Sequence, residues 1–365
     1  QPGRLISLDV PAGMHSNHGQ MQAGGGAVAS DTLCVGLVKR GLVQDAALAN
    51  AGCVHRLDPG VPRQLIDQRD ASAVLRVMAK DLVTLPVPQD SPMAMKYQRG
   101  RVLVLAGSER YRGAAVLAAH GAMASGVGSL KAALPEAVAE LIWQWIPELV
   151  VSASLPATAS RGLAWGPWLA HADLTRLDAL LLGPGVGALE GHWDAWAEPL
   201  VSFQGLLVLD ADGLNALAGS KQGWRWLCRR EFPTWITPHR SEFARLFPDF
   251  SGREPLESAQ WAAAESGAVV LLKGAHSLIA DPNGVVHQLV DTSVQSARAG
   301  LGDLLAGFAV GWGARCLACG EESRGTALAA AALLHAEAAR TSEDASSANE
   351  IAKTLAELTR QICAN

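Results

Sequence analysis

Hydrophobic positions in this chain fall into short continuous runs, most of which end at Gly, Pro or Asp. Such runs predict buried strands, and the stretches rich in small and apolar residues between them predict helices. Continuous rather than alternating runs are typical of parallel strands that are covered on both faces. Beyond residue 100 the expected strands are 102–108, 129–135, 177–187, 206–215, 234–239 and 269–280. The expected helices are 114–125, 135–146, 303–314, 325–340 and 349–363.

Strands that alternate with helices predict a three-layer α/β/α domain with a mostly parallel central sheet, which we expect to span residues 95–365. The first segment differs, because its runs predict three strands with little helix between them, at 5–10, 32–38 and 53–57. Three strands alone make a poor domain. We therefore expect residues 1–65 to be the last part of an α/β (Rossmann-like) domain. The proline-containing stretch 66–94 is predicted to be a linker, with one short helix in this region.

The composition is that of a globular protein, because 49% of the 365 residues are hydrophobic and 18% are charged. The net charge of −5 and the absence of a basic run argue against nucleic acid as a partner. No apolar run approaches the ~20 residues needed to span a bilayer, so we expect no membrane segment. Six cysteines without framework spacing suit a reducing compartment, the cytoplasm. We also expect a small-molecule substrate and a homo-oligomer.

Residues with distinctive chemistry gather where the expected strands end. They are Gly183, Gly185, Asp210, Asp212, Asn215, Thr237, His239, Lys273 and Gly274. Ligands of open α/β sheets bind beyond the carboxyl ends of the strands, so this shared position predicts one site.

Each of these residues also has a structural interpretation. Asp210 and Asp212 either hold Mg²⁺ through water or cap the following helix. Lys273 either meets a phosphate or lies in a hairpin turn. A lone histidine is more often structural, but the position of His239 after a strand favours a functional role.

The most informative segment is ARAGLGDLLAGFAVG at 297–311. In this segment Gly300 and Gly302 flank Leu301, and Asp303 begins an apolar helix. A glycine turn at a helix start directs several backbone N–H groups and the helix dipole at one point, which favours a bound phosphate. Asp303 would then lie beside that phosphate, placed to take a proton from a hydroxyl. The alternative is that Asp303 is the N-cap residue of the helix.

In this order, the segments resemble the ADP/ATP-dependent NAD(P)H-hydrate dehydratase family, a branch of the ribokinase-like superfamily. The resemblance covers residues 95–340 and rests on KYQRG (96–100), GSERYRGAA (107–115), GPGVG (183–187), DADGLN (210–215), TPHRSE (237–242), KGAHS (273–277) and GLGDLLAG (300–307). Residues 1–60 resemble the last strands of an NAD(P)H-hydrate epimerase domain. In this chain LDVPAG (8–13) occupies the place of the epimerase motif L-D-[VI]-P-S-G. We expect no epimerase activity from this fragment alone.

The resemblance implies a ribokinase-like fold and the repair of hydrated NADH or NADPH, with ADP or ATP and Mg²⁺ as cofactors. The nucleotide would phosphorylate the ring hydroxyl, and the phosphate would then leave to restore the double bond. Asp303 would deprotonate the hydroxyl while Gly300 and Gly302 cradle the phosphoryl group. The resemblance further implies nucleotide contacts from Lys273, Gly274, Ala275, His276, Ser277 and Gly302. It implies substrate contacts from Ala114, Gly185, His239 and Asp303.

The chain departs from the family pattern at three positions. Leu301 replaces the serine of G-S-G-D, Ser241 replaces a glycine after the T-P-H motif, and Arg298 stands in place of an N-P-G stretch. A serine at position 301 would offer the phosphate one more donor, so we expect Leu301→Ser not to weaken nucleotide binding. Two alternatives follow, a nucleotide-binding relative with weakened catalysis and another small-molecule kinase of the superfamily.

Overall fold

Two units divide the chain in the computed structural model. Unit 1 comprises residues 1–75 together with 274–276, and unit 2 comprises 76–273 and 277–365. The residues that the structure describes are 3–67, 74–189, 191–250, 252–291, 293, 297–321, 324–343 and 346–364.

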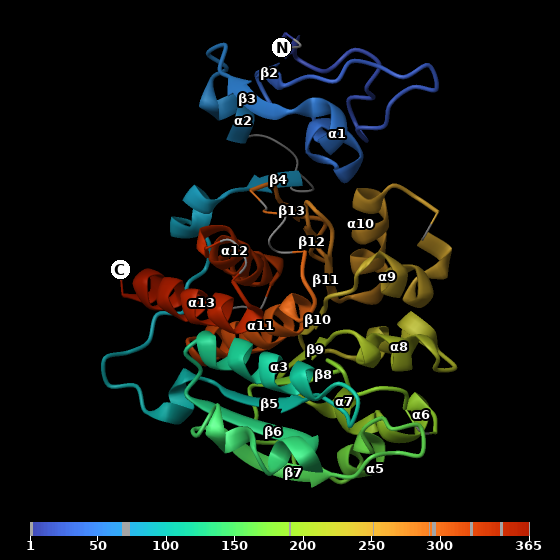
Figure 1. Ribbon diagram of the computed structural model, residues 1–365, viewed down its shortest axis with the longest axis vertical. Coiled ribbons are helices and arrows are strands. Elements are labelled where there is room, and N and C mark those ends of the chain that lie inside the picture. The colour runs from blue at the N-terminus through green and yellow to red at the C-terminus, as the bar shows by residue number, and fades with distance from the viewer. Residues whose placement is uncertain are drawn as a thin grey trace. The chain divides into compact units, whose positions relative to one another are not determined.

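Unit 1 is built on a three-stranded parallel sheet, in the order β1 (Ile6–Leu8), β2 (Asp31–Val35) and β3 (Cys53–Leu57) (Figure 1). The short helices α1 (Leu48–Ala51) and α2 (Arg63–Asp67) accompany it. Its small core holds Met14, Cys34, Leu42, Ala47 and Ala51. The β1 side chains of Ile6 and Leu8 are 60% and 70% exposed. The three expected strands are therefore present, and they bury little apolar surface.

The second sheet has ten strands in the order β4-β13-β12-β11-β10-β9-β8-β5-β6-β7 (Figure 1). From β11 to β7 neighbouring strands are parallel, whereas β12 and β13 are antiparallel additions. The central strands are buried at every position, as their continuous apolar runs predict. The strands are β4 (Val74–Val77), β5 (Arg101–Leu105), β6 (Ser129–Pro135), β7 (Val150–Leu155), β8 (Ala179–Leu182), β9 (Leu206–Leu209), β10 (Thr234–Ile236), β11 (Val269–Leu272), β12 (Leu278–Ala280) and β13 (Val286–Leu289).

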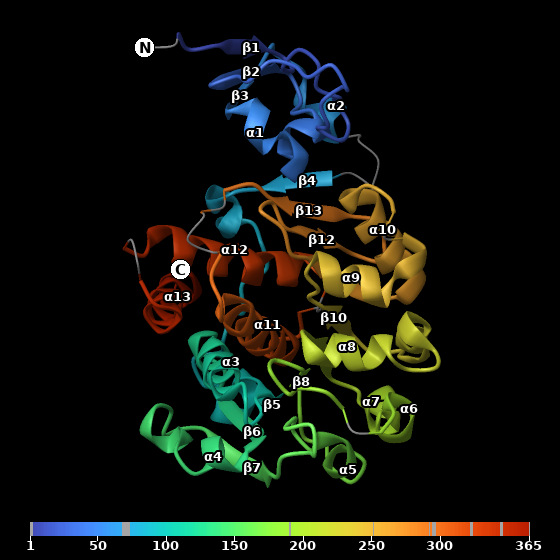
Figure 2. The ribbon, with the colours of Figure 1, turned by 45° about the vertical axis from the view of Figure 1, so that its right-hand side comes forward.

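Helices cover both faces of this sheet, which gives the expected three layers. One layer contains α3, α11, α12 and α13, and the opposite layer contains α8, α9 and α10 (Figures 1 and 2). The helices of unit 2 are α3 (Arg112–Ala124), α4 (Glu136–Ala139), α5 (Trp165–Leu169), α6 (Trp193–Trp196), α7 (Glu198–Ser202), α8 (Asp212–Ala218), α9 (Arg240–Leu246), α10 (Pro255–Ser266), α11 (Leu301–Ala318), α12 (Gly325–Thr341) and α13 (Ala348–Cys363).

The close packing of α3 against α11 depends on two glycines. A Cβ at Gly121 would lie 2.1 Å from the carbonyl oxygen of Leu304, and a Cβ at Gly307 would lie 1.9 Å from that of Ala118. Neither position can carry a side chain unless the two backbones separate. The glycines thus set the distance between the helices and hold the first turn of α11 in place.

Two local expectations differ from the structure. The stretch expected to be a linker contains β4, a short run that joins the large sheet beside β13. The helix expected at 135–146 is split into α4 and a 3-10 turn at Ile142–Gln144. Only a narrow stripe of this segment is buried, including Val138, Ile142 and Ile146. Such a stripe supplies too little packing to sustain a continuous helix.

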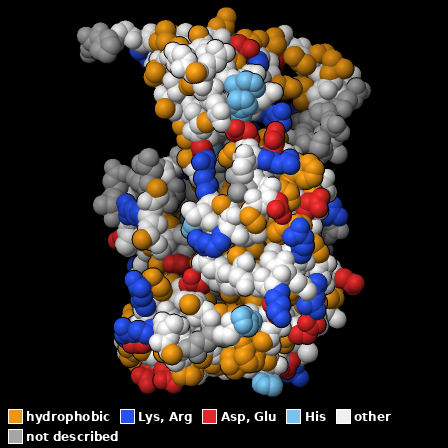
Figure 3. Space-filling model, turned by 90° about the vertical axis from the view of Figure 1, so that its right-hand side faces the viewer, with side chains coloured by type: hydrophobic (Ala, Val, Ile, Leu, Met, Phe, Trp, Pro, Cys, Tyr) orange, Lys and Arg blue, Asp and Glu red, His pale blue; other side chains and the backbone are white. Residues whose placement is uncertain are grey.

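The charged side chains of unit 2 are mixed on the face that carries α8–α10. Acidic and basic side chains are interspersed there rather than segregated (Figure 3). Among the described residues, no helix combines the length and the apolar character that a membrane crossing requires.

Candidate active site

The large sheet changes its winding direction between β5 and β8. The chain passes from β5 outward to β6 and β7, and then returns to β8 on the other side of β5. The turns that follow these two strands are joined, because Gly107 N–H donates to the carbonyl of Pro184 over 2.7 Å and Gly183 N–H donates to that of Leu105 over 3.2 Å. Open α/β sheets bind their ligands at such a point.

Two of the predicted substrate contacts meet at this crossing. Gly185 has φ +63°, and a Cβ on it would lie 2.6 Å from Cβ of Ala114 and 2.8 Å from Cβ of Tyr111. A side chain at Gly185 would therefore collide with the start of α3. Ala114 and Gly185, although far apart in sequence, line the same small-residue turn.

Asp212 ties the glycine turn to α8. Its Oδ2 accepts from the backbone N–H of Gly187 over 2.9 Å, and its Oδ1 accepts from Nδ2 of Asn215 over 3.2 Å. The preceding residue, Ala211, has φ +48°, which is strained for a residue with a side chain. The DAD segment is therefore held in a costly backbone conformation directly after β9.

A buried charge pair connects β9, β10 and β11. The ammonium of Lys273 lies 2.7 Å from Oδ1 of Asp210, and the Thr237 hydroxyl donates to the same oxygen over 2.9 Å. Asp210 is only 1% exposed. A Cβ on Gly302 would lie 3.7 Å from Nζ of Lys273 with nothing nearer, so the first turn of α11 faces this cation.

Gly300, and not Asp303, is the N-cap residue of α11. Gly300 has φ +87°, and a Cβ on it would lie 2.5 Å from the side chain of Leu117 in α3. Asp303 stands three residues after the cap, in the first turn, and no side chain caps the helix. The interpretation of Asp303 as the cap residue is therefore wrong, and the backbone N–H groups at this end have no side-chain cap.

The electrostatic surroundings of Asp303 suit a proton acceptor. Burial, together with the negative charge of Asp210, raises the pKa of Asp303 to about 6, although Lys273 opposes the rise. Asp212 and Glu242 add smaller contributions in the same direction as Asp210. A carboxylate with a pKa close to the working pH is ionised at pH 7 and still basic enough to accept a proton.

Lys273 keeps its positive charge in these surroundings. Burial opposes that charge, but Asp210, Glu242 and Asp303 outweigh the effect of burial and raise the pKa of Lys273. The site therefore combines a fixed cation with a glycine turn at a helix start, which is a suitable environment for a phosphate.

His239 caps α9 in a way that fixes its tautomer. Its Nδ1 accepts from the backbone N–H groups of Ser241 over 3.1 Å and Glu242 over 3.3 Å. The ring proton consequently resides on Nε2, which lies 3.3 Å from Oε1 of Glu242. The replacement of glycine by Ser241 is compatible with this cap, because the cap uses only the backbone N–H of that residue.

The predicted nucleotide loop is divided between the two units. Lys273 follows β11 and pairs with His239 as an isolated parallel bridge, in which Lys273 N–H donates to Pro238 O over 2.9 Å. Ser277 belongs to unit 2, and its carbonyl accepts from Leu289 N–H over 3.0 Å. Gly274, Ala275 and His276 group with unit 1, so the site of unit 2 contains only the two ends of this loop. Residues 273–277 also connect the antiparallel strands β11 and β12, which agrees with the interpretation of this stretch as a hairpin turn.

A direct metal site is not formed by the predicted aspartates. Among the residues that the structure describes, no group of three or more His, Cys, Asp and Glu side chains could hold a metal ion. Oδ1 of Asp210 and both oxygens of Asp212 already accept hydrogen bonds from the protein. A magnesium ion here would depend mainly on phosphate oxygens and water, which is common for Mg²⁺.

The departures from the family pattern have structural roles. The Leu301 side chain is 2% exposed and belongs to the core of unit 2, so a serine there would not meet a phosphate, contrary to expectation. A guanidinium nitrogen of Arg298 donates to the carbonyl of Ser346. Sequence reasoning also missed His335 of α12, whose pKa burial lowers to about 4 and whose Nε2 has no hydrogen-bond partner among the described residues. An Ala-rich helix gives no signal for such a residue.

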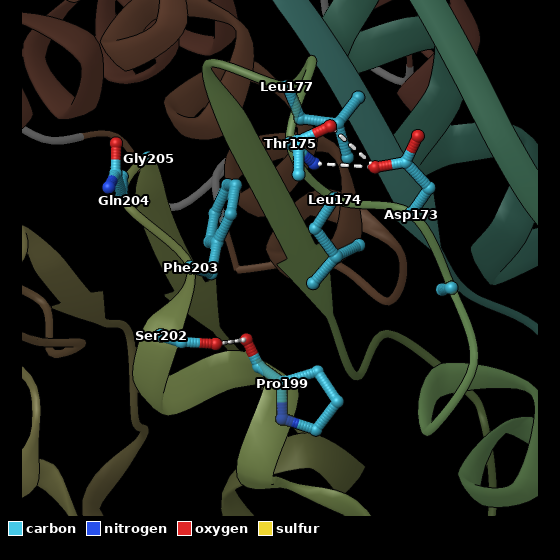
Figure 4. Close-up of a pocket in the computed structure, with 10 residues that line it drawn as sticks. Asp173, Leu174, Thr175, Leu177, Pro199, Ser202, Phe203, Gln204 and Gly205 are labelled. Atoms are coloured by element: carbon cyan, nitrogen blue, oxygen red, sulfur yellow. Dashed lines mark hydrogen bonds between the residues drawn. The ribbon is translucent and has the colours of Figure 1, made fainter.

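A separate cavity of 310 Å³ lies where the chain enters β8 and β9, at the amino ends of these strands. Figure 4 shows that its polar groups pair with one another, because Thr175 donates to Asp173 and Ser202 donates to the carbonyl of Pro199. No cluster of charges converges on it. The glycine turns and the Asp210–Lys273 pair lie at the opposite, carboxyl ends of the strands, which favours that edge as the active site.

Comparisons with known proteins point to the same region. A family model described as NAD(P)H-hydrate dehydratase matches residues 102–362. The bifunctional NAD(P)H-hydrate repair enzyme of Synechocystis sp. is 38% identical over 312 residues, which are 84% of this chain and 57% of that protein. The chain thus spans little more than half the length of this relative.

Solved structures share the fold. The ADP/ATP-dependent NAD(P)H-hydrate dehydratase from Bacillus subtilis, co-crystallised with ATP and Mg²⁺, is 27% identical with a TM-score of 0.64, over 80% of this chain and 100% of that chain. A ribokinase-like superfamily protein from Enterococcus faecalis matches with a TM-score of 0.65 and 20% identity, over 81% of this chain and 99% of that chain. The latter likeness concerns the fold alone, and it agrees with the expected ribokinase-like architecture.

Proposed function

The chain belongs to the NAD(P)H-hydrate dehydratase family, and from this premise we propose that it dehydrates hydrated NADH or NADPH with ADP or ATP as phosphate donor. The observation that carries the proposal is the position of Asp303. This carboxyl lies in the first turn of α11, beside the glycine turn, with a pKa raised to about 6 by burial and by Asp210. That combination supports a general base next to a phosphate site.

In the first step, the ring hydroxyl attacks the terminal phosphorus of the nucleotide and Asp303 accepts the hydroxyl proton. The bond from that phosphorus to its bridging oxygen breaks, which releases ADP from ATP or AMP from ADP. In the second step, the phosphate leaves with the electrons of its bond to the ring carbon. The adjacent carbon loses a proton, and the ring double bond is restored.

The protein's own contribution to phosphoryl transfer is positioning and charge compensation. Gly300 and Gly302 would present backbone N–H groups to the transferring phosphoryl group, and Lys273 would compensate the phosphate charge. Ser277 and Gly302, which belong to the same unit, would hold the remaining phosphates. Magnesium, when bound with the nucleotide, would spread the phosphate charge further.

We assign the hydrated dinucleotide to the turn at the β5–β8 crossing. Ala114 and Gly185 are both partly exposed at this turn, so a ligand can approach the backbone there. His239 would share its Nε2–H between the substrate and Oε1 of Glu242, which lies 3.3 Å away, because its Nδ1 is already occupied by the cap of α9. Its role is thus to bind the substrate rather than to accept a proton.

The alternative of a catalytically weakened relative receives little support from the departures. Leu301 is part of the core, the α9 cap tolerates Ser241, and Arg298 contacts the backbone of Ser346. None of these contacts displaces Asp303, Lys273 or His239. We therefore favour an active enzyme over a scaffold subunit.

We propose that residues 1–65 are the remnant of an epimerase-like domain and that 95–365 form a dehydratase domain, to whose sheet β4 from the intervening stretch 66–94 adds a strand. The small core of the three-stranded sheet and the exposure of most of β1 and β3 support this division. Asp9 lies after β1 and accepts from Lys39 and from the backbone N–H of Val35, and the hydrogen bond from Lys39 lowers its pKa. A carboxylate engaged in this way supports a structural role for Asp9.

We further propose a cytoplasmic homo-oligomer. All six cysteines are free, which suits a reducing compartment. Strand β7 ends the large sheet, and residues 141–151 expose Leu141, Trp143, Trp145, Val150 and Val151. An uncovered edge with large apolar side chains favours self-association. Sedimentation velocity should give a multiple of the chain mass that Trp143→Glu reduces, and a monomer at micromolar concentration would contradict this proposal.

The decisive experiment supplies hydrated NADH or hydrated NADPH together with ADP or ATP. Absorbance of the restored dihydronicotinamide reports turnover, and the release of phosphate should equal it. Omission of the nucleotide serves as the control. Turnover of neither hydrate with either nucleotide would refute the proposed function.

A further inference from the structure

Asp210 is a buried carboxylate of the site, and groups of the protein itself hold it in place. Its Oδ1 accepts from the Thr237 hydroxyl over 2.9 Å and lies 2.7 Å from the ammonium of Lys273. The side chain is 2% exposed in this pair. An oxygen with two such donors is poorly available to a metal ion.

The backbone of Asp210 is fixed as firmly as its side chain. Its N–H donates to the carbonyl of Leu182 over 3.2 Å, and its carbonyl accepts from Gly213 N–H over 2.9 Å. A Cβ at Gly183 would lie 1.8 Å from that carbonyl oxygen, so the neighbouring strand leaves no room for movement. Asp210 is thus a rigid anchor at the end of β9.

We propose that Asp210 is a positioning residue for the phosphate-binding cation: held by Thr237, it fixes the ammonium of Lys273 beside Gly302. This inference rests on the proposed function, because the phosphates are those of the nucleotide. A lysine side chain is long and flexible, and it must be ordered before it can bind a phosphate. The anchor orders it in advance, which reduces the loss of conformational freedom on binding.

The anchor also acts on Asp303 through its charge. The charged groups that face Asp303 are Asp210, Lys273, Asp212 and Glu242. The charge of Asp210 disfavours ionised Asp303 directly and also offsets the favourable effect of Lys273. Loss of this charge therefore stabilises ionised Asp303 by both routes. In a profile of kcat/KM against pH, the acid limb is the range in which the rate falls as the pH decreases. For the variant, this limb should move to lower pH.

The test compares substitutions at Asp210 and Thr237. Asp210→Asn keeps the shape but removes the charge, and we expect adenine nucleotide binding to weaken on the order of tenfold, as for the loss of a charged hydrogen bond. Thr237→Val removes only the hydroxyl and should weaken binding by a smaller factor without moving the acid limb. Thr237→Ser retains the hydroxyl and should restore the affinity.

Asp178→Asn is the matched control, because Asp178 is also a carboxylate of unit 2 that pairs with a cation, Arg101, but it contacts none of the proposed site residues. Binding of a non-hydrolysable ATP analogue is measured by calorimetry, which needs no turnover. The Asp178 variant should bind the analogue within about twofold of the wild type, well below the factor of a lost charged hydrogen bond. The pH profile of kcat/KM is then measured for each active variant.

The outcomes separate this inference from the proposed function. Normal analogue binding by a folded Asp210→Asn protein, or an equal loss in Asp178→Asn, would overturn the role of Asp210. Analogue binding that depends on Asp210, without turnover of either hydrate, would leave the inference intact and refute the dehydratase function. A wild type that binds no adenine nucleotide would refute both. Should Asp210→Asn fail to fold, the Thr237→Val and Thr237→Ser pair decides the question.

Discussion

At the scale of single residues, the proposed function assigns the role of general base to Asp303. Asp303→Asn removes the proton acceptor but leaves the backbone of the Gly300 turn unchanged. We expect turnover to fall by about 10²–10⁴-fold, the usual effect of losing a general base. Nucleotide affinity, measured by calorimetry, should stay within a few-fold of the wild type. Nearly normal turnover would show that Asp303 has only a structural role.

The raised pKa of Asp303 predicts the pH dependence of the reaction. Burial and the charge of Asp210 raise this pKa to about 6, and only the ionised carboxylate accepts a proton. The value of kcat/KM should therefore be level above about pH 7 and fall about tenfold per unit well below pH 6. Stopped assays across pH 4.5–8 in buffers of constant ionic strength measure this profile. An acid limb near pH 4 would mean that the base is an unperturbed carboxyl.

At the scale of elements, the first turn of α11 depends on Leu301 for packing. Because this side chain is buried in the core of unit 2, Leu301→Ser should destabilise the protein by about 3 kcal/mol, within the range of large-to-small core substitutions. Leu301→Met, which preserves volume, should cost less than about 1.5 kcal/mol. Denaturant unfolding measures both. Tighter nucleotide binding by the serine variant without loss of stability would restore the expectation drawn from the sequence.

The α3–α11 contact offers a matched pair of glycine substitutions. A Cβ at Gly307 would lie 1.9 Å from the carbonyl oxygen of Ala118, so Gly307→Ala should destabilise by about 1–3 kcal/mol. Gly113, at the start of α3, has open space around the same position. Gly113→Ala should therefore stabilise the protein by about 0.4–1 kcal/mol through the unfolded chain. Equal effects of the two substitutions would argue against close helix contact.

At the scale of the whole molecule, the division of the chain predicts which part carries the activity. Asp303, Lys273, His239 and Gly185 all belong to unit 2. A protein that starts near residue 70 retains β4 and should therefore keep the full dehydratase rate. Loss of the rate would show that residues 1–69 contribute to the site. Interconversion of the two epimers of the hydrate by the intact chain would contradict the proposal that residues 1–65 are catalytically silent.

The sequence by itself determined the class of fold, and it predicted where the site lies. Continuous apolar runs that end in Gly or Asp predicted parallel strands, and the ordered motifs indicated the family that the comparisons support. The Asn283–Gly284 pair marks the β12–β13 hairpin, and Gly284 has the positive φ that such a turn requires. These features depend on residues close together in the chain, so local preference is sufficient to reveal them.

Only the tertiary structure decided which groups act on one another. Asp210, Thr237, Lys273 and Asp303 come from four separate segments, and their mutual effect depends on the strand order and on burial. The inward direction of Leu301 and the N-cap role of Gly300 likewise follow from how α11 packs, not from the pattern G-L-G-D. A pKa or a side-chain orientation arises from the field and packing of distant neighbours, which a local sequence pattern does not contain.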